Sequence, residues 1–276
     1  VPKKLKDALA LIDKEPGRWR VLAGGTDLMV PLETGMPPPA NFINLWELKE
    51  LKTVSITASQ VMLGSLLTYT SVRNHEILCK EFPNLAIAAA ATGTVAIQNR
   101  GTLGGNIANA SPAADSCPAL LAYDARLNLI SVNGVRTIPY SSFHLGYKKT
   151  ALSPNELIHC VILPRTFKGW RHFYRKVGTR RAQTISKVVM AGAALMKKNG
   201  VYDIRIAFGS LAPTAIRCFG TEDGLRGQKI STSLINHAKK TLLTEIAPID
   251  DIRSTAEYRR NVACNLLEQF LWSLGP

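Results

Sequence analysis

The sequence lacks the patterns of several common functional sites. Its five cysteines are an odd number without a CxxC pair, which disfavours a disulfide framework and a protein-borne zinc or iron–sulfur site. The five histidines have no metal-ligand spacing, and GxGxxG, GxxxxGK[ST] and GxSxG are all absent. No apolar run approaches the length of a membrane span. Rossmann, P-loop and nucleophile-elbow sites are therefore unsupported, no catalytic acid or base is nominated, and reduced thiols favour a cytoplasmic location.

The charge is strongly positive but scattered. Lys and Arg outnumber Asp and Glu by 34 to 20, which gives a net charge of +14. Such a balance raises the hypothesis of a nucleic-acid-binding module, which would show steep salt dependence. The basic residues, however, occur as isolated doublets such as Lys148-Lys149 and Lys197-Lys198, and no basic run is interleaved with aromatic residues. We therefore favour a solvated surface, or a docking face for an acidic protein partner, over nucleic acid.

Hydrophobic periodicity divides the chain into three regions: residues 1–55, 56–168 and 169–276. The first two read as α/β units, and the third as an antiparallel meander followed by helices, so the predicted class is α+β. Asn133-Gly134, between two apolar runs, predicts a hairpin. Strands are expected at 19–23, 42–45, 54–57, 61–64, 126–132, 135–138, 157–163, 170–177, 188–197 and 201–211, and helices at 5–12, 69–78, 85–91, 111–123, 234–246 and 254–274.

Two glycine-rich segments, residues 22–28 and 101–107, are the most informative feature. Each pairs adjacent glycines with a small hydroxyl or amide residue, and glycine lets an oxyanion approach the main chain closely. Each is read as a loop, and the first is expected to lead into a helix capped by Thr26 or Asp27. A single loop of this kind is equally compatible with a tight strand-to-helix turn. Two of them suggest a dinucleotide held between them.

Two polar residues follow the second segment closely. Ser111 and Asp115 would stand at the start of a helix, where the Asp115 carboxylate could accept hydrogen bonds from ribose or ribityl hydroxyls. A purely structural interpretation makes Ser111 the N-cap, Pro112 the first helical residue and Asp115 a favourable contact with the helix dipole. Both interpretations can hold together.

A family resemblance rests on these segments. AGGTD at 23–27 and QNRGTLGGNIANASPAAD at 98–115 resemble the FAD-binding medium subunit of the molybdenum hydroxylases, which include xanthine dehydrogenase and carbon monoxide dehydrogenase. The resemblance continues through YRKVGTRRAQTISKV at 174–188 and AFGSLAPTAIR at 207–217, and it spans nearly the whole chain. The longer second motif is the specific one.

The resemblance implies a PCMH-type FAD-binding fold, with two α/β subdomains holding an extended FAD and a smaller C-terminal α+β domain. It also implies a heteromeric oxidoreductase. A large partner would carry the molybdopterin cofactor and a small partner the [2Fe-2S] clusters, and electrons would pass through FAD on this chain to NAD or another acceptor. The cofactor-binding residues that it implies are Leu22, Ala23, Gly24, Gly25, Thr26, Asp27, Leu28, Thr102, Gly104, Gly105, Asn106, Ile107, Ser111, Asp115, Ile158 and Lys176.

Two of these residues are implied to lie at the flavin ring. Ile158, expected on a strand edge, falls where family members pack an aliphatic residue against the isoalloxazine, and Lys176 falls where they place a basic residue. A cation there would stabilise the anionic reduced flavin. The chain departs from xanthine oxidoreductases at Gln183, where those carry an acidic residue, which affects the choice between NAD and oxygen as acceptor.

A stand-alone flavin oxidase of the vanillyl-alcohol-oxidase type is the alternative enzyme. Such an oxidase needs its own substrate cavity and usually a His or Cys for covalent flavin attachment, and neither glycine-rich segment contains a histidine. The substrate of the expected complex stays open, because a partner would select it.

Overall fold

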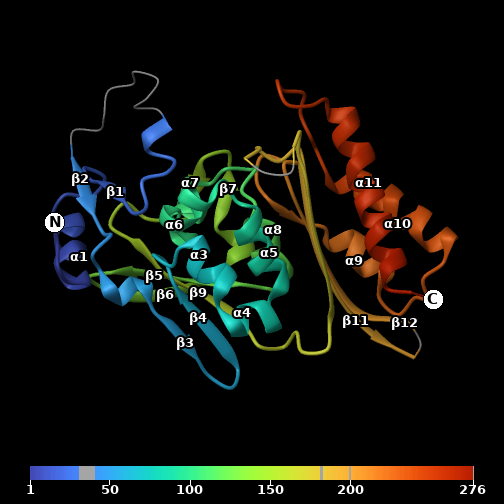
Figure 1. Ribbon diagram of the computed structural model, residues 1–276, viewed down its shortest axis with the longest axis horizontal. Coiled ribbons are helices and arrows are strands. Elements are labelled where there is room, and N and C mark those ends of the chain that lie inside the picture. The colour runs from blue at the N-terminus through green and yellow to red at the C-terminus, as the bar shows by residue number, and fades with distance from the viewer. Residues whose placement is uncertain (31–40, 181–182, 199, 276) are drawn as a thin grey trace.

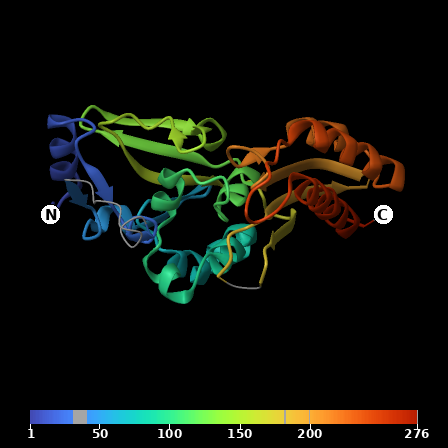
Figure 2. The same ribbon diagram turned by 90° about the horizontal axis from the view of Figure 1, so that it is seen from above.

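The computed structural model describes residues 1–30, 41–180, 183–198 and 200–275 (Figure 1). They form an α+β fold in which antiparallel sheets pack against helices, as predicted. Seen from above, the N-terminal helix and the C-terminal helices lie at opposite ends of the molecule (Figure 2).

The N-terminal region is a small α/β unit. Helix α1 (Leu5–Lys14) precedes two short parallel strands, β1 (Arg20–Leu22) and β2 (Phe42–Asn44). The helix buries Ala8, Leu9 and Ile12 on one face, which is the periodicity that predicts it. These side chains join a core with Ile43 and with Leu157 from a distant strand. The N-terminal unit therefore packs against the five-stranded sheet that follows it in the sequence.

A five-stranded antiparallel sheet forms the middle of the molecule, in the order β3-β4-β9-β5-β6. Helices cover one face, where inward side chains of β4, β5 and β9 meet those of α3, α5, α7 and α8 in one core cluster. The strands are β3 (Val54–Ile56), β4 (Gln60–Gly64), β5 (Arg126–Ser131), β6 (Gly134–Pro139) and β9 (Leu157–Pro164). The helices are α3 (Tyr69–Asn74), α4 (Glu76–Glu81), α5 (Pro83–Ala91), α6 (Val95–Arg100), α7 (Leu103–Asn109) and α8 (Cys117–Ala122). Short pieces are η1 (Lys49–Lys52), η2 (Tyr140–Ser142), β7 (His144–Gly146) and β8 (Lys149–Thr150).

The C-terminal sheet is buried on both faces. Its order is β10-β11-β12-β13, and in Figure 1 it stands between the central helices and α9, α10 and α11. Ala191, Ala193 and Ala207 face the first core, whereas Met190 and Phe208 face the second. The strands are β10 (Arg171–Val177), β11 (Val188–Lys197), β12 (Gly200–Gly209) and β13 (Ile216–Arg217), and the helices are α9 (Phe219–Leu225), α10 (Thr232–Glu245) and α11 (Ala256–Ser273). Small alanines on one face and larger residues on the other let both helical layers approach the sheet.

The predicted strands, the hairpin at Asn133-Gly134 and the two long C-terminal helices are confirmed, with shifts at their ends. Gly134 has φ +118°, the conformation that the hairpin requires. The predicted helix at 69–78 is instead two helices that meet at His75, the C-cap of α3 and N-cap of α4.

Two expectations were wrong around the second glycine-rich segment. It is not a loop: Thr102 caps a helix, α7, that begins at Leu103 and includes both Gly104 and Gly105. The next helix, α8, begins at Cys117 rather than at Ser111, because residues 111–116 form turns after Ala110, which has φ +49°. Near the first segment, helix begins at Met29, and the rest of that predicted helix lies outside the described residues.

No helix in the described ranges combines the length and hydrophobicity of a membrane span. The five cysteines are all free thiols.

Candidate cofactor site

The first glycine-rich segment is a bend with open backbone donors. Strand β1 ends at Leu22, and the chain turns through Gly25 at φ +82°. Met29 N donates to Gly25 O at 3.0 Å, but the backbone N–H groups of residues 24–28 have no partner among the described residues. Most of this segment is half-buried, with Asp27 exposed. Half-buried N–H groups without partners are suited to binding an anion.

The two glycine-rich segments touch each other. A Cβ on Gly24 would overlap the carbonyl oxygen of Arg100 and lie 2.6 Å from its carbonyl carbon. A Cβ on Gly105 would lie 3.7 Å from the Cβ of Ala23. Gly24 and Gly105 therefore make room for each other's segments. Arg100 in turn lies over the ring of Trp46, with 3.8 Å from its Cζ to the ring centroid.

The second segment contributes a helix end whose donors are already used. Leu103 N donates to Leu67 O at 2.9 Å, Gly104 N to Ser65 O at 2.8 Å, and Gly105 N to the Thr102 hydroxyl at 3.1 Å. A Cβ on Gly104 would lie 2.5 Å from the Cβ of Ser65, so this glycine is needed for packing. Among the described residues, the two segments thus differ: the N–H groups of residues 24–28 are open, whereas those of the first turn of α7 are bonded.

Two side chains that the family resemblance assigns to the cofactor, Asp115 to the flavin nucleotide and Lys176 to the flavin ring, are hydrogen-bonded to each other. Lys176 Nζ, on β10, donates to Asp115 Oδ2 at 2.7 Å and to Ala91 O at 2.9 Å. The side chains of Lys176 and Asp115 are only 10% and 9% exposed. Burial raises the pKa of Asp115, while Lys176 and a hydrogen bond from Ser186 lower it. Pairing offsets part of the cost of burying each charge.

Three further predicted residues have different surroundings. Asn106 Oδ1 accepts a hydrogen bond from Ser116 Oγ at 3.0 Å, and Ser116 also contacts Tyr69 OH. Ser111 is half-buried, and its hydroxyl accepts from Ala113 N at 3.3 Å, so it does not cap α8. Ile158 is not on a sheet edge, because β9 is the central strand, and its side chain is 6% exposed within the core.

Sequence reasoning missed several residues that support this region. Tyr174 OH donates to the backbone oxygen of Asp115 at 3.0 Å, and Ser186 Oγ donates to its carboxylate at 2.5 Å. Lys148 Nζ donates to Asn109 O and Oδ1 at 2.8 and 2.6 Å. Burial lowers the pKa of Lys148, the charge of Asp27 raises it and that of Arg20 lowers it, so Lys148 interacts electrostatically with a residue of the first segment. The Lys148-Lys149 doublet was the only sequence signal for it.

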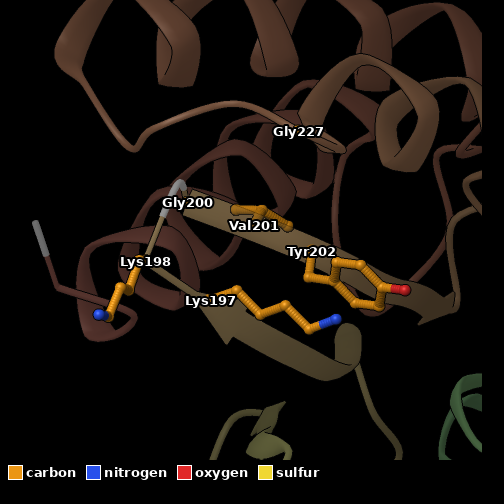
Figure 3. Close-up of a pocket in the computed structure, with 6 residues that line it drawn as sticks. All are labelled: Lys197, Lys198, Gly200, Val201, Tyr202 and Gly227. Carbon is orange, nitrogen blue, oxygen red and sulfur yellow. The ribbon is translucent and has the colours of Figure 1, made fainter.

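A cavity in the described part of the chain lies away from these residues. It measures about 650 Å³ and opens at the β11–β12 hairpin (Figure 3). Its lining includes Lys197, Lys198 and Tyr202, and Figure 3 shows the Lys197 side chain extending toward the Tyr202 ring. None of the predicted cofactor residues lines it. Among the described residues, no group of three or more His, Cys, Asp or Glu side chains could hold a metal ion.

The fold and the site together define an α+β protein whose open N–H groups suit an anionic cofactor. Residues 1–166 match the family model described as the FAD binding domain in molybdopterin dehydrogenase, and residues 172–274 match the CO dehydrogenase flavoprotein C-terminal domain. The chain therefore belongs to the FAD-binding medium subunits of the molybdenum hydroxylases, a family of oxidoreductase components.

Individual relatives agree with this assignment. The xanthine dehydrogenase FAD-binding subunit of Escherichia coli O157:H7 is 30% identical over 259 residues, which cover 92% of this chain and 88% of the relative. The carbon monoxide dehydrogenase medium chain of Hydrogenophaga pseudoflava is 29% identical over 272 residues, 98% of this chain and 94% of that one. A structure of carbon monoxide dehydrogenase from H. pseudoflava, lacking the Mo-pyranopterin moiety, superposes with a TM-score of 0.94 at 27% identity, and covers 99% of this chain and 96% of that one.

Proposed function

We propose that this chain holds FAD as the electron-transfer subunit of a heteromeric molybdenum hydroxylase. The observation that carries the proposal is the row of N–H groups at residues 24–28, which have no partner within the described part of the chain. The Lys148 ammonium interacts electrostatically with Asp27 of the same segment. An FAD diphosphate carries two negative charges and needs such donors. The fit supports FAD, because the open donors, the Lys148 cation and the polar pair Asp115–Lys176 match its charged and hydroxylated parts.

Different residues of the chain would bind different parts of FAD. Residues 22–28 would bind the diphosphate, with Gly25 supplying the bend and Thr26 a hydroxyl. Residues 102–107 would shape the adjoining wall, with Asn106 as a polar contact, and Ser111 and Asp115 would bind nucleotide hydroxyls. Ile158 and Lys176 would lie at the flavin ring. When bound, FAD supplies the ability to accept and release electrons singly or in pairs.

The rest of the reaction would take place on partner subunits. We infer a large subunit with the molybdopterin cofactor and a small subunit with [2Fe-2S] clusters, whose electrons would reach NAD or another acceptor through this chain. Similar relatives are named for xanthine, carbon monoxide and nicotine. Since similar FAD subunits belong to enzymes named for such different substrates, we propose that the large partner selects the substrate.

A flavin-binding titration tests the proposal directly. The full chain is stripped of any cofactor and titrated with FAD, and binding is followed by flavin fluorescence and by the visible absorption bands. We expect stoichiometric FAD uptake and much weaker binding of FMN, which lacks the second phosphate and the adenosine. No uptake of FAD would contradict the proposal, and equal affinity for FMN would contradict the diphosphate assignment.

The same preparation separates the alternatives. A vanillyl-alcohol-oxidase-type enzyme would show covalently attached flavin, or flavin that a substrate bleaches in the isolated chain. A nucleic-acid-binding protein would bind DNA or RNA with a steep salt dependence. We expect neither behaviour.

A further inference from the structure

Asp115 lies at the end of a chain of hydrogen bonds that begins on the C-terminal helix α11. We propose that Ser186, Ser210 and Arg259 are positioning residues that fix the Asp115 carboxylate beside Lys176 and thereby set the affinity of the site for the flavin nucleotide. This inference rests on the proposed function and assigns a task to three residues of the C-terminal domain.

The first link orients the carboxylate itself. Ser186 Oγ donates to Asp115 Oδ1 at 2.5 Å, while Lys176 Nζ donates to Asp115 Oδ2 at 2.7 Å. Each oxygen therefore has its own donor, which fixes the rotation of the carboxylate plane. Ser186 is 1% exposed and Asp115 8%, so water does not substitute easily for the serine hydroxyl.

The second link holds Ser186 and the backbone before Asp115 at the same time. Ser210 Oγ donates to Ser186 O at 3.0 Å, and Ser210 N donates to Pro112 O at 2.9 Å. Ser210 has φ +66°, a left-handed conformation that is unfavourable for a residue other than glycine. One strained residue thus ties the segment that leads to Asp115 to the residue that orients its carboxylate.

The third link anchors Ser210 to helix α11. Arg259 Nη1 donates to Ser210 O at 3.1 Å, and Arg259 Nη2 donates to Asp251 Oδ1 at 2.7 Å. Arg259 is only 4% exposed, which is rare for arginine unless it is paired. Its guanidinium holds the peptide of Ser210 from one side and the loop before α11 from the other. The cation therefore stabilises the left-handed peptide on which the two serine contacts depend.

The test is a set of conservative variants of the full chain. Ser186→Ala removes only the donor to Asp115. Ser210→Gly removes the hydroxymethyl side chain and keeps both backbone bonds, because glycine readily adopts a positive φ. Arg259→Lys keeps the charge, whereas Arg259→Gln removes it. Ser273→Ala is the matched control, since the Ser273 hydroxyl donates to Phe270 O at the far end of α11.

Three quantities are measured for each variant: the FAD dissociation constant, the thermal midpoint of the chain without FAD, and the pKa of Asp115 from its carboxyl carbon resonance. We expect Ser186→Ala to weaken FAD binding about tenfold, the loss expected for a hydrogen bond to a charged group. Ser210→Gly should weaken it several-fold, and Arg259→Gln more than Arg259→Lys. Ser186→Ala should also lower the thermal midpoint, because a buried hydrogen bond to a carboxylate is lost, whereas the midpoint of Ser210→Gly should stay close to that of Ser273→Ala.

The Asp115 pKa gives a readout that a merely structural role would not move. Ser186 stabilises the charged carboxylate, so its removal should raise this pKa, while Ser273→Ala should leave it unchanged. The other titratable groups that act on or touch Asp115 are Lys176 and Tyr174 on β10, Tyr69 on α3 and Cys117 on α8. All four remain in every variant, and the change can therefore be attributed to the serine.

The outcomes separate the positioning role from the proposed function. If the unmodified chain does not bind FAD, the proposed function fails, and the Asp115 pKa still decides the positioning role. If it binds FAD but Ser186→Ala and Ser210→Gly leave both affinity and pKa unchanged, the positioning role is wrong. It is also wrong if the loss of affinity simply follows the loss of thermal stability across all variants, the control included.

Discussion

Replacing Gly24 with alanine should damage both folding and cofactor binding. The added methyl group would overlap the Arg100 carbonyl and lie 3.2 Å from Gly101 N, so one of two backbone segments must move. Overpacking of this kind costs about 1–3 kcal/mol. At about 2–4 °C per kcal/mol for a chain of this size, the thermal midpoint should fall by roughly 2–12 °C. Displaced N–H groups at residues 24–28 would also weaken binding. Two lost bonds to a charged phosphate are worth about 3 kcal/mol or more, about a hundredfold in affinity.

The assay compares Gly24→Ala with a glycine that has room for a side chain. Gly146, in β7, has no heavy atom within 4 Å of an added Cβ and no positive φ, so Gly146→Ala should bind FAD and melt like the unmodified chain. Both variants are titrated with FAD and melted without it. If Gly24→Ala matches Gly146→Ala in both measurements, the close contact between the first segment and Arg100 is wrong. The sequence alone leaves Gly24 between a ligand contact and a tight turn, whereas the structure adds a packing role against Arg100.

Three further perturbations test other parts of the structure. Lys148→Met keeps most of the side chain but removes the charge beside Asp27, and FAD affinity measured by titration should fall several-fold at low salt and less at high salt. The hydrogen bond from Arg136 lowers the pKa of Glu156 to about 2, so Glu156 contributes stability above its ordinary value of 4.5 that is lost as the pH falls toward 2. Because Arg136 is 44% exposed, the loss is about 1 kcal/mol, and urea unfolding of Glu156→Gln between pH 5 and 2.5 should lack it. FAD at a hundred times its dissociation constant should stabilise the chain by about 2.7 kcal/mol, measured as a raised thermal midpoint.

A specific result would contradict each of these predictions. An unchanged affinity for Lys148→Met at low salt would remove Lys148 from the cofactor site. A Glu156→Gln variant with the same acid sensitivity as the unmodified chain would mean that other carboxylates dominate. A thermal midpoint that FAD does not raise would show that the folded chain does not bind it.

Most strands and the long C-terminal helices could be predicted, because the spacing of their apolar residues shows whether each element is buried on one face or on both. Helix α7 could not, since Gly-Gly-Asn has a low helix propensity. There the tertiary contacts decide: Thr102 caps the first turn, and Gly104 is small enough to lie against Ser65. The same glycines that suggested a loop from the sequence are what allow the helix to pack.

The sequence and the family resemblance predicted individual residues of the candidate site, but not the contacts between them. The sequence and the family resemblance point to Asp115 and to Lys176, yet nothing in a single sequence indicates that residues 61 positions apart form an ion pair. Ser186, 71 positions from Asp115, carries no motif of its own. Side chains that hold other side chains in place become visible only when the sheet brings β10 and β11 next to the helices of the preceding region.

This arrangement makes the C-terminal domain part of the proposed cofactor site. The open N–H groups belong to the first region, but Lys176 and Ser186, which hold Asp115, come from the C-terminal sheet. That sheet also completes the first core through Ala191, Ala193 and Ala207. Separating the two parts would take Lys176 and Ser186 away from Asp115 and expose the apolar face that Ala191, Ala193 and Ala207 cover, which is destabilising. We therefore expect folding of the C-terminal domain and FAD binding at the proposed site to be coupled, because the same residues would contribute to both.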